Sequence, residues 1–215
     1  MNLKIDELLK LQPGLSCLDN VIEGEITVEI HDKGFYINNT YHIKIVVDYE
    51  SPFFSEVYET KGALKSDYIH KYSNGMLCLS TPIDLKIAES RDCSLVRLYA
   101  DFIEPYFFSY EFYERFGFFP YEDRKHGLDG VLDSYREITG IEDYVKVYLL
   151  LQSISLRNYK YRGHLSCPCG SNCKTRNCHP NIKTLFLDEN VVRQAKQDYK
   201  HMERVINEHQ RETKQ

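Results

Sequence analysis

The chain has 215 residues, of which 42% are hydrophobic and 27% charged, and its formal net charge is −5. A chain of this length buries about 70 to 75% of its unfolded surface, which fits one main domain with an appendage. The mild negative charge argues against a broad surface for nucleic acid or for anionic membranes. Because no apolar run approaches the ~18 residues of a membrane span and charged residues interrupt the N-terminal segment, we expect a soluble cytoplasmic protein.

The first part of the chain predicts a helix followed by a sheet. Apolar residues at helical spacing indicate a short amphipathic helix over residues 3–11. Segments that alternate polar with apolar residues, or lie between turn residues, predict strands over residues 25–30, 35–37, 42–48 and 56–60. Turns are predicted at residues 32–34 and 38–40, so the expected architecture is a four-stranded antiparallel meander.

A turn signal followed at once by a cysteine lies within residues 68–82. The pair Asn74-Gly75 favours a tight turn with positive φ, and the apolar residues after it carry the chain in an extended piece to Cys78. A cysteine between two leucines is either a small buried hydrophobe or a nucleophile. We take Cys78 as the candidate nucleophile.

Beyond Ser94 the hydrophobic period becomes that of a helix. Because Pro105 cannot donate a backbone hydrogen bond, we expect a break near Glu104 and a second helix that Gly117 ends. Two further helices are predicted over residues 128–139 and 141–158, the second of which is apolar enough to be core.

The last predicted helix covers residues 188–209. Its apolar side chains repeat at intervals of three and four at Val192, Ala195, Tyr199, Met202, Ile206 and His209. Such a stripe must face another surface, which is either the protein's own domain or a partner.

Four of the seven cysteines lie within residues 167–178, and His179 follows them directly. This clustering is typical of a metal site in a reducing compartment. Lys174 and Arg176 give the segment a basic edge, which is either a docking surface for a partner or nucleic acid or simply a solvated face.

The run Asn74-Gly75-Met76-Leu77-Cys78-Leu79 resembles the N-G-x-[IL]-C-L signature of ubiquitin-conjugating enzymes. The order of helix, meander, cysteine loop and helices is similar to the fold of that family over roughly residues 1–116, and Asp48-Tyr49 followed by Pro52 is a looser version of its Tyr-Pro segment. The resemblance implies an α+β fold in which Cys78 accepts a ubiquitin-like protein as a thioester from an activating enzyme. The acyl group would then pass to an amine of a target protein.

One departure from that family concerns its His-Pro-Asn motif, whose Asn lies eight positions before the cysteine. Here that position is His70, whose imidazole is either a hydrogen-bond donor in place of the amide or a structural side chain. His70, Asn74 and the nearby backbone N–H groups are the local candidates to stabilise an oxyanion.

Residues 117–127, followed by Gly130 and Tyr135, look like a loop of the bacterial ubiquitin-conjugating-like proteins found in antiphage operons. His126 and Asp123 lie in this loop. They are either further catalytic groups that close over Cys78 or polar surface residues.

The segment Cys167-Pro-Cys169-Gly-Ser, with Cys178-His179 beginning nine positions after Cys169, is similar to the SEC-C motif, C-x-C-x8-C-[CH]. The resemblance implies structural zinc bound by Cys167, Cys169, Cys178 and His179. Cys173 is the surplus thiol and the alternative fourth ligand.

We therefore predict a ubiquitin-conjugating-like domain over residues 1–160 and a zinc knuckle with a C-terminal amphipathic helix over residues 161–215. The first functional hypothesis is a thioester-forming acyl carrier of bacterial antiphage defence. The alternatives are a catalytically silent binding module with the same fold and a cysteine hydrolase that pairs Cys78 with His70 or His126.

Overall fold

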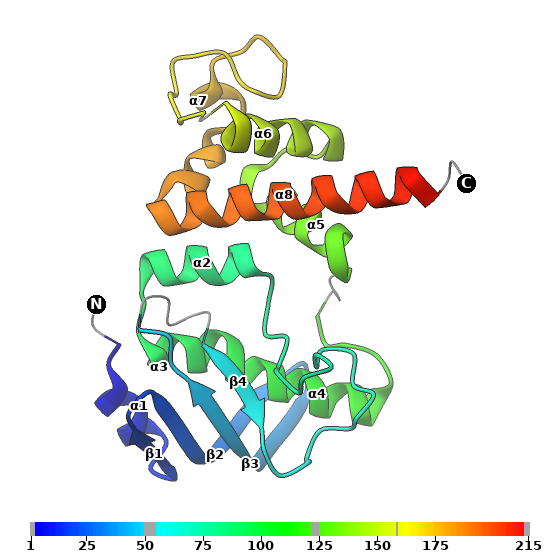
Figure 1. Ribbon diagram of the computed structural model, residues 1–215. Coiled ribbons are helices and arrows are strands. Elements are labelled where there is room, and N and C mark those ends of the chain that lie inside the picture. Colours follow the sequence, from blue (N-terminus) through cyan, green and yellow to red (C-terminus); the bar gives the residue numbers. More distant parts are fainter. Residues whose placement is uncertain (1–2, 50–54, 122–124, 158, 213–215) are drawn as a thin grey trace. The chain divides into compact units, whose positions relative to one another are not determined.

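The computed structural model describes residues 3–49, 55–121, 125–157 and 159–212 (Figure 1). The chain divides into two compact units, Met1–Ser80 with Arg91–Asp123, and Thr81–Ser90 with Arg124–Gln215. The predicted α+β class, with an N-terminal helix, a four-stranded antiparallel sheet and C-terminal helices, is confirmed. Within the described ranges, no helix combines the length and the apolar character needed to cross a membrane.

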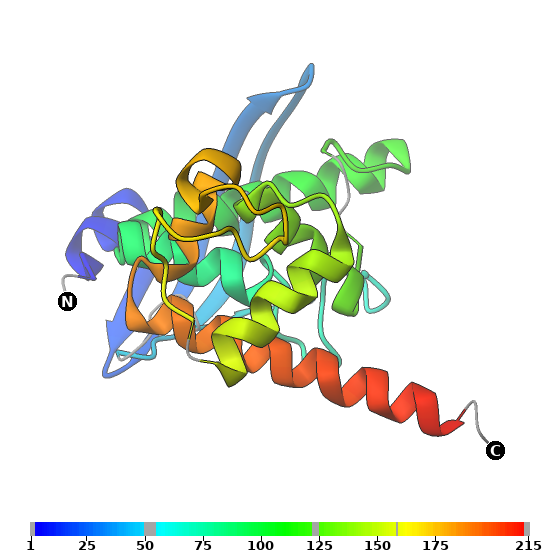
Figure 2. The same cartoon turned by 90° about the horizontal axis from the view of Figure 1, so that it is seen from above.

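The first unit begins with helix α1 (Ile5–Leu11) and continues into a sheet in which neighbouring strands follow chain order. The strands are β1 (Leu15–Leu18), β2 (Val21–Asp32), β3 (Phe35–Val46) and β4 (Glu56–Glu59), and every pairing is antiparallel. The predicted turn between β2 and β3 is confirmed, with positive φ at Lys33 and Gly34. Figure 2 shows these two strands as a long ribbon.

The predicted strand boundaries need two corrections. Residues 35–37 and 42–48 are not separate strands with a turn between them, because residues 38–40 lie inside β3 and pair with residues 27–29 of β2. These polar residues are exposed. Their composition resembles that of a turn because this part of β3 faces solvent. The prediction also missed β1, in which three of the four residues are exposed and no alternation marks a strand.

A long helical segment packs on the sheet. It consists of α3 (Leu95–Leu98), the π-helical turn η2 (Tyr99–Ile103) and α4 (Glu104–Phe116). The expected break at Glu104 is a change of hydrogen bonding rather than an interruption, since the N–H of Glu104 donates to the carbonyl of Tyr99 in a π turn. Such a turn fits beside Pro105, which has no N–H to donate. Gly117 ends α4 as predicted.

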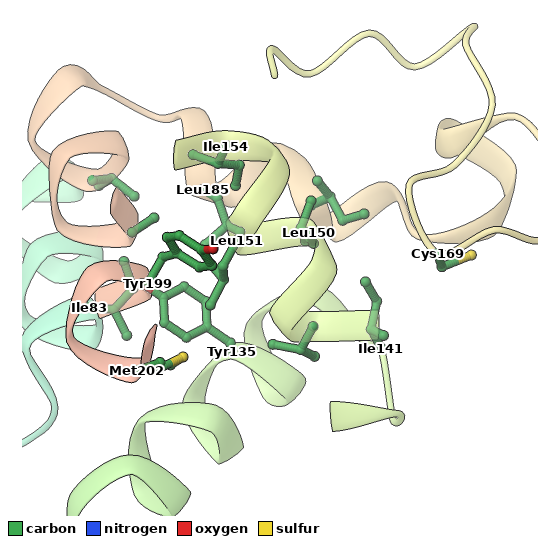
Figure 3. Close-up of a cluster of buried hydrophobic side chains, with 14 of the residues drawn as sticks. Ile83, Tyr135, Ile141, Leu150, Leu151, Ile154, Cys169, Leu185, Tyr199 and Met202 are labelled. Carbon is green, nitrogen blue, oxygen red and sulfur yellow. The ribbon is translucent and has the colours of Figure 1, made fainter. Parts of the chain in front are cut away.

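The second unit is helical. Its elements are α2 (Pro82–Arg91), α5 (Gly127–Thr139), α6 (Tyr144–Leu156), α7 (Thr175–Cys178), the 3-10 helix η3 (Pro180–Phe186) and α8 (Glu189–Glu212). Figure 3 shows how Tyr135, Leu151 and Tyr199 from three of these helices meet in one hydrophobic cluster. The prediction that the apolar segment within α6 is core is confirmed in part, because Leu150 and Leu151 are buried whereas Leu149 is 45% exposed.

The apolar stripe of α8 packs against its own unit. Ala195, Tyr199 and Met202 are buried in the cluster, whereas Ile206 is 40% exposed. The side chain of His209 lies outside the described residues. Packing within the protein therefore accounts for most of the stripe.

The boundary between the two units differs from the predicted boundary at residue 160. Helices α5 and α6 share their core with Cys167, Cys169 and α8, so residues 124–160 belong with the cysteine segment. Helix α2, which lies between the two parts of the first unit in sequence, also belongs here. This helix was not predicted, although Thr81-Pro82 followed by Asp84 is a typical N-terminal sequence of a helix. The hydroxyl of Thr81 donates to Asp84 Oδ2 at 2.8 Å.

A buried polar network crosses this core. The hydroxyl of Tyr135, which is fully buried, donates to Asp198 Oδ2 at 2.7 Å, and the amide of Gln194 donates to Asp198 Oδ1 at 2.7 Å. Burial raises the pKa of the Asp198 carboxyl, and the two hydrogen bonds only partly oppose that change. The ionised carboxylate is therefore less favourable in the folded protein than in the unfolded chain.

We expect Asp198→Asn to change the pH dependence of stability. A carboxyl whose pKa is raised by folding contributes stability below its unfolded pKa of about 3.9 and loses that contribution as pH rises through the folded value. The melting temperature of Asp198→Asn minus that of the wild type should therefore rise as the pH increases above about 4. Thermal denaturation monitored by circular dichroism measures this difference. The same change at the exposed Asp67 should give a flat difference, and a flat difference for Asp198→Asn would contradict the prediction.

Candidate functional site

The four predicted metal ligands lie together in the second unit. The ligand atoms of Cys167, Cys169, Cys178 and His179 are all within 4.8 Å of one another. The sulfurs of Cys169 and Cys178 are 3.6 Å apart. The Nδ1 atom of His179 lies 3.4 Å from the sulfur of Cys167 and 3.3 Å from that of Cys178. Three sulfurs and one ring nitrogen thus converge, and the group could hold a metal ion.

A short hairpin brings these ligands together. The N–H of Cys167 donates to the carbonyl of Cys173 at 2.7 Å, and the N–H of Thr175 donates to the carbonyl of Leu165 at 2.9 Å. Gly170 turns the chain after the first two cysteines with a φ of 81°, a conformation that glycine adopts without a steric cost. Helix α7 then returns the third cysteine and the histidine to the first two. Short-range contacts within the segment therefore build the whole cluster.

The thiols of the cluster differ in acidity. Burial raises the pKa of the Cys167 thiol to about 12. Burial also acts to raise the pKa of Cys169, but hydrogen bonds from Ser171 and from the thiols of Cys167 and Cys178 together stabilise its thiolate more, so this pKa is lowered to about 6. A divalent ion bound by these thiols would displace their protons, because the thiolate is the form that binds a metal.

The donor set and its spacing fit a tetrahedral metal such as zinc. Zn–S bonds of about 2.3 Å and Zn–N bonds of about 2.0 Å place neighbouring ligand atoms about 3.5 to 3.8 Å apart in a tetrahedron. The observed separations of 3.3, 3.4 and 3.6 Å are close to this range. Thiolate and imidazole are ligands that zinc prefers, unlike magnesium or calcium. Cys173 is exposed and does not belong to the cluster. Its backbone carbonyl accepts the hydrogen bond from the N–H of Cys167 in the hairpin.

Cys78 lies in the first unit, at the end of a short extended piece beside β4. The N–H of Leu77 donates to the carbonyl of Val57 at 2.8 Å, and Met76 forms a bridge with Tyr58. These contacts attach the piece to the exposed edge of the sheet. The thiol that follows is half-buried, so it is held in place by backbone pairing but keeps access to solvent.

The turn before Cys78 has the predicted tight form. Gly75 has a φ of 87°, and its N–H donates to the carbonyl of Tyr72 at 2.9 Å. The side-chain oxygen of Asn74 accepts from the N–H of Met76 at 3.1 Å. Asn74 therefore shapes the turn through its own side chain, and its part in stabilising an oxyanion stays a prediction.

Tyr72 was not among the predicted site residues, yet its hydroxyl lies 3.4 Å from the sulfur of Cys78. Partial burial and the neighbouring thiol raise the pKa of Tyr72 to about 12. The phenol is therefore protonated at neutral pH, and its oxygen accepts a hydrogen bond from the thiol of Cys78. The Asn74-Gly75 turn was the available signal, because it folds residue 72 back toward residue 78.

His70 contacts the cysteine through its backbone. Its carbonyl accepts hydrogen bonds from the N–H of Cys78 at 2.8 Å and from the hydroxyl of Tyr106 at 3.0 Å. Its imidazole meets the rings of Tyr68 and Phe119 edge to face, with centroids 5.5 and 5.1 Å apart. His70 thus ties the segment before the turn to Cys78 and packs its ring among aromatics. Its role as an oxyanion donor stays a prediction.

His126 belongs to the second unit, where it is the exposed residue that precedes α5. Its catalytic role also stays a prediction. Asp123, the other candidate in that loop, lies outside the described residues, as does Pro52 of the segment after β3.

Comparisons with models of protein families, with curated proteins and with solved structures found no match for this chain.

Proposed function

We propose that the protein is a ubiquitin-conjugating-like acyl carrier in which Cys78 accepts a ubiquitin-like protein as a thioester. The observation that carries the proposal is the position of Cys78: a half-buried thiol at the end of an extended piece paired with β4, 3.4 Å from the hydroxyl of Tyr72. The same piece carries the residues that resemble the signature of that family. The order of helix, four-stranded antiparallel sheet, cysteine loop and helix further supports a ubiquitin-conjugating-like fold.

The proposed chemistry is two successive acyl transfers. The Cys78 thiolate attacks the terminal carbonyl carbon of the ubiquitin-like protein, which the activating enzyme holds as a thioester, and the thiolate of the activating enzyme leaves. An amine of the target protein then attacks the new thioester. The tetrahedral intermediate expels the Cys78 thiolate, an amide bond forms, and the amine proton passes to solvent.

Tyr72 has the geometry of a hydrogen-bond donor for this reaction. Because its phenol stays protonated at neutral pH and lies beside the sulfur, it can donate to the charge that develops on the thioester oxygen. Tyr72 is therefore a stronger candidate for this role than the side chain of His70, which packs against Tyr68 and Phe119.

We further propose that the metal of the Cys–His cluster is zinc and that its role is structural. The four side chains would take all four positions of a tetrahedral ion, whereas a catalytic zinc keeps one position open for water or substrate. The ion would hold the hairpin of residues 163–179 against the core of the second unit, to which Cys167 and Cys169 belong.

A charging assay tests the acyl-carrier proposal. The purified protein is incubated with ATP, a co-encoded activating enzyme and a ubiquitin-like protein, and the products are separated with and without reductant. We expect a single adduct that reductant removes, because a thioester exchanges with added thiols. The catalytically silent binding module instead predicts a stable complex without a covalent adduct. The cysteine hydrolase predicts release of the free ubiquitin-like protein without ATP.

A further inference from the structure

The positive charge of this protein is concentrated in one part of the chain. Residues 157–187 contain six Lys or Arg residues and no Asp or Glu, whereas the rest of the chain contains 21 basic and 32 acidic residues, a formal charge of −11. Three thiolates on one divalent ion would lower the charge of the segment from +6 to +5. The net charge of the whole chain therefore hides a strongly basic segment, and such asymmetry is a mark of proteins that bind polyanions.

Part of this segment lines a groove of about 800 Å³ within the second unit. Residues 159–161 form one side, residues of η3 a second and the first turns of α8 a third. The volume lies within the range of about 300 to 1,000 Å³ that is typical of ligand sites. The groove is therefore large enough for a ligand with several groups.

The side chains of the groove combine cations with aromatic rings. The cationic residues are Lys160, Lys183, Arg193 and Lys196, and the aromatic residues are Tyr159, Tyr161 and Phe186. Two carboxylates, those of Asp188 and Glu189, also line it, which leaves a net charge of +2. Asp188 accepts a hydrogen bond from the N–H of Val191 at 2.9 Å, so its negative charge faces the N-terminus of α8, where the helix dipole favours it.

The aromatic rings are anchored and partly accessible. Tyr159, Tyr161 and Phe186 are half-buried and pack against the hydrophobic cluster of the unit. The rings of Tyr159 and Phe186 meet edge to face with centroids 5.8 Å apart. Rings fixed in this way lose little conformational freedom when a planar group stacks on them, and nucleobases are the planar groups that accompany phosphates.

The basic residues continue from the groove toward the metal cluster. Arg162 follows the groove residues Lys160 and Tyr161, and the N–H of Arg176 donates to the carbonyl of Gly163 at 3.0 Å. The backbone pairing thus joins the groove segment to the basic edge of the cysteine hairpin. A ligand that uses both must be longer than one nucleotide.

We propose that this groove binds single-stranded nucleic acid, with its cations on the phosphates and its aromatic rings against the bases. The proposal is independent of the acyl-carrier chemistry, because Cys78 belongs to the other unit. It assigns to the second unit a binding function beyond support of the metal site.

The test is fluorescence anisotropy of the full-length, metal-loaded protein with labelled 20-residue oligo(dT) and oligo(rU) at several salt concentrations. We expect saturable binding at 50 mM salt and a logarithmic salt slope of about −2 to −3, since each phosphate contact of a single strand contributes about −0.7. The double variant Lys183→Glu/Arg193→Glu should weaken binding at least tenfold and make the slope shallower. Lys146→Glu/Lys200→Glu changes the net charge equally at exposed positions that do not line the groove and should bind as the wild type does.

Further variants separate stacking from simple charge attraction. Tyr161→Leu keeps an apolar side chain on the core but removes the ring, and it should weaken binding to oligo(dT) about tenfold while binding to heparin is unchanged. Cys78→Ala should bind like the wild type.

The proposal is overturned if no binding occurs at 50 mM salt, if the two charge-reversal variants behave alike, or if a mononucleotide binds as tightly as the oligomer. Metal content and melting temperature of each variant show that it remains folded.

Discussion

Removal of the metal should unfold the cysteine hairpin and leave the first unit intact. Structural zinc sites contribute on the order of 10 kcal/mol to folding, which is comparable to the entire stability of a typical domain. Because Cys167 and Cys169 lie within the core of the second unit, loss of the ion should also loosen the packing of α6 and α8. The sheet has a separate core that includes Ile26 and Ile43, both fully buried.

Hydrogen exchange with and without a chelator measures this prediction segment by segment. We expect the amides of residues 163–179 to lose at least a hundredfold of their protection, whereas those of β2 and β3 should be unchanged. Metal analysis of the purified wild type should give one equivalent of zinc. A protein without metal, or equal loss of protection in both units, would contradict the prediction.

Ligand variants test the same site with matched chemistry. Cys169→Ser and Cys178→Ser should each abolish metal binding, whereas Cys173→Ser should retain one equivalent because Cys173 is exposed and outside the cluster. His179→Ala should lower metal affinity strongly. If zinc were lost in Cys173→Ser but retained in His179→Ala, Cys173 would be the fourth ligand.

Replacement of Cys78 by Ala should abolish the covalent adduct completely. The adduct requires a nucleophile at this position, and Cys78→Ser should trap it as an ester that reductant does not remove. Cys17→Ala is the matched control because Cys17 is an exposed thiol in the same unit, and this variant should charge normally. An adduct that persists in Cys78→Ala would exclude the residue as the acyl carrier.

Tyr72→Phe should separate charging from transfer. The substitution keeps the ring and removes only the hydroxyl 3.4 Å from the sulfur. Loss of one oxyanion donor typically costs about 100-fold in rate, so we expect the thioester to form but to discharge to an added amine at least tenfold more slowly in single-turnover assays. Tyr36→Phe, at an exposed tyrosine of β3, should discharge at the wild-type rate. Unchanged discharge by Tyr72→Phe would assign Tyr72 a purely structural role.

The sequence by itself determined the features that depend on neighbouring residues. The Cys–His cluster follows from cysteines and a histidine within one short segment, because a tight hairpin brings such residues together without help from the rest of the chain. The ends of α4 and α5 at Gly117 and Gly140 are local for the same reason, since positive φ favours glycine at a helix end. The turn at Asn74-Gly75 is a further example.

Only the tertiary structure decided the features that depend on residues far apart. Residues 38–40 have the composition of a turn, but pairing with β2 holds them in a continuous strand. Helix α2 joins the second unit because Ile83 and Ile87 are buried among side chains of later helices, and no local pattern encodes that choice. The contact of Tyr72 with Cys78 and the groove beside α8 likewise arise when separate segments pack together. Long-range packing outweighs local preference at these places because burial of apolar surface supplies more free energy than the propensity of any single segment.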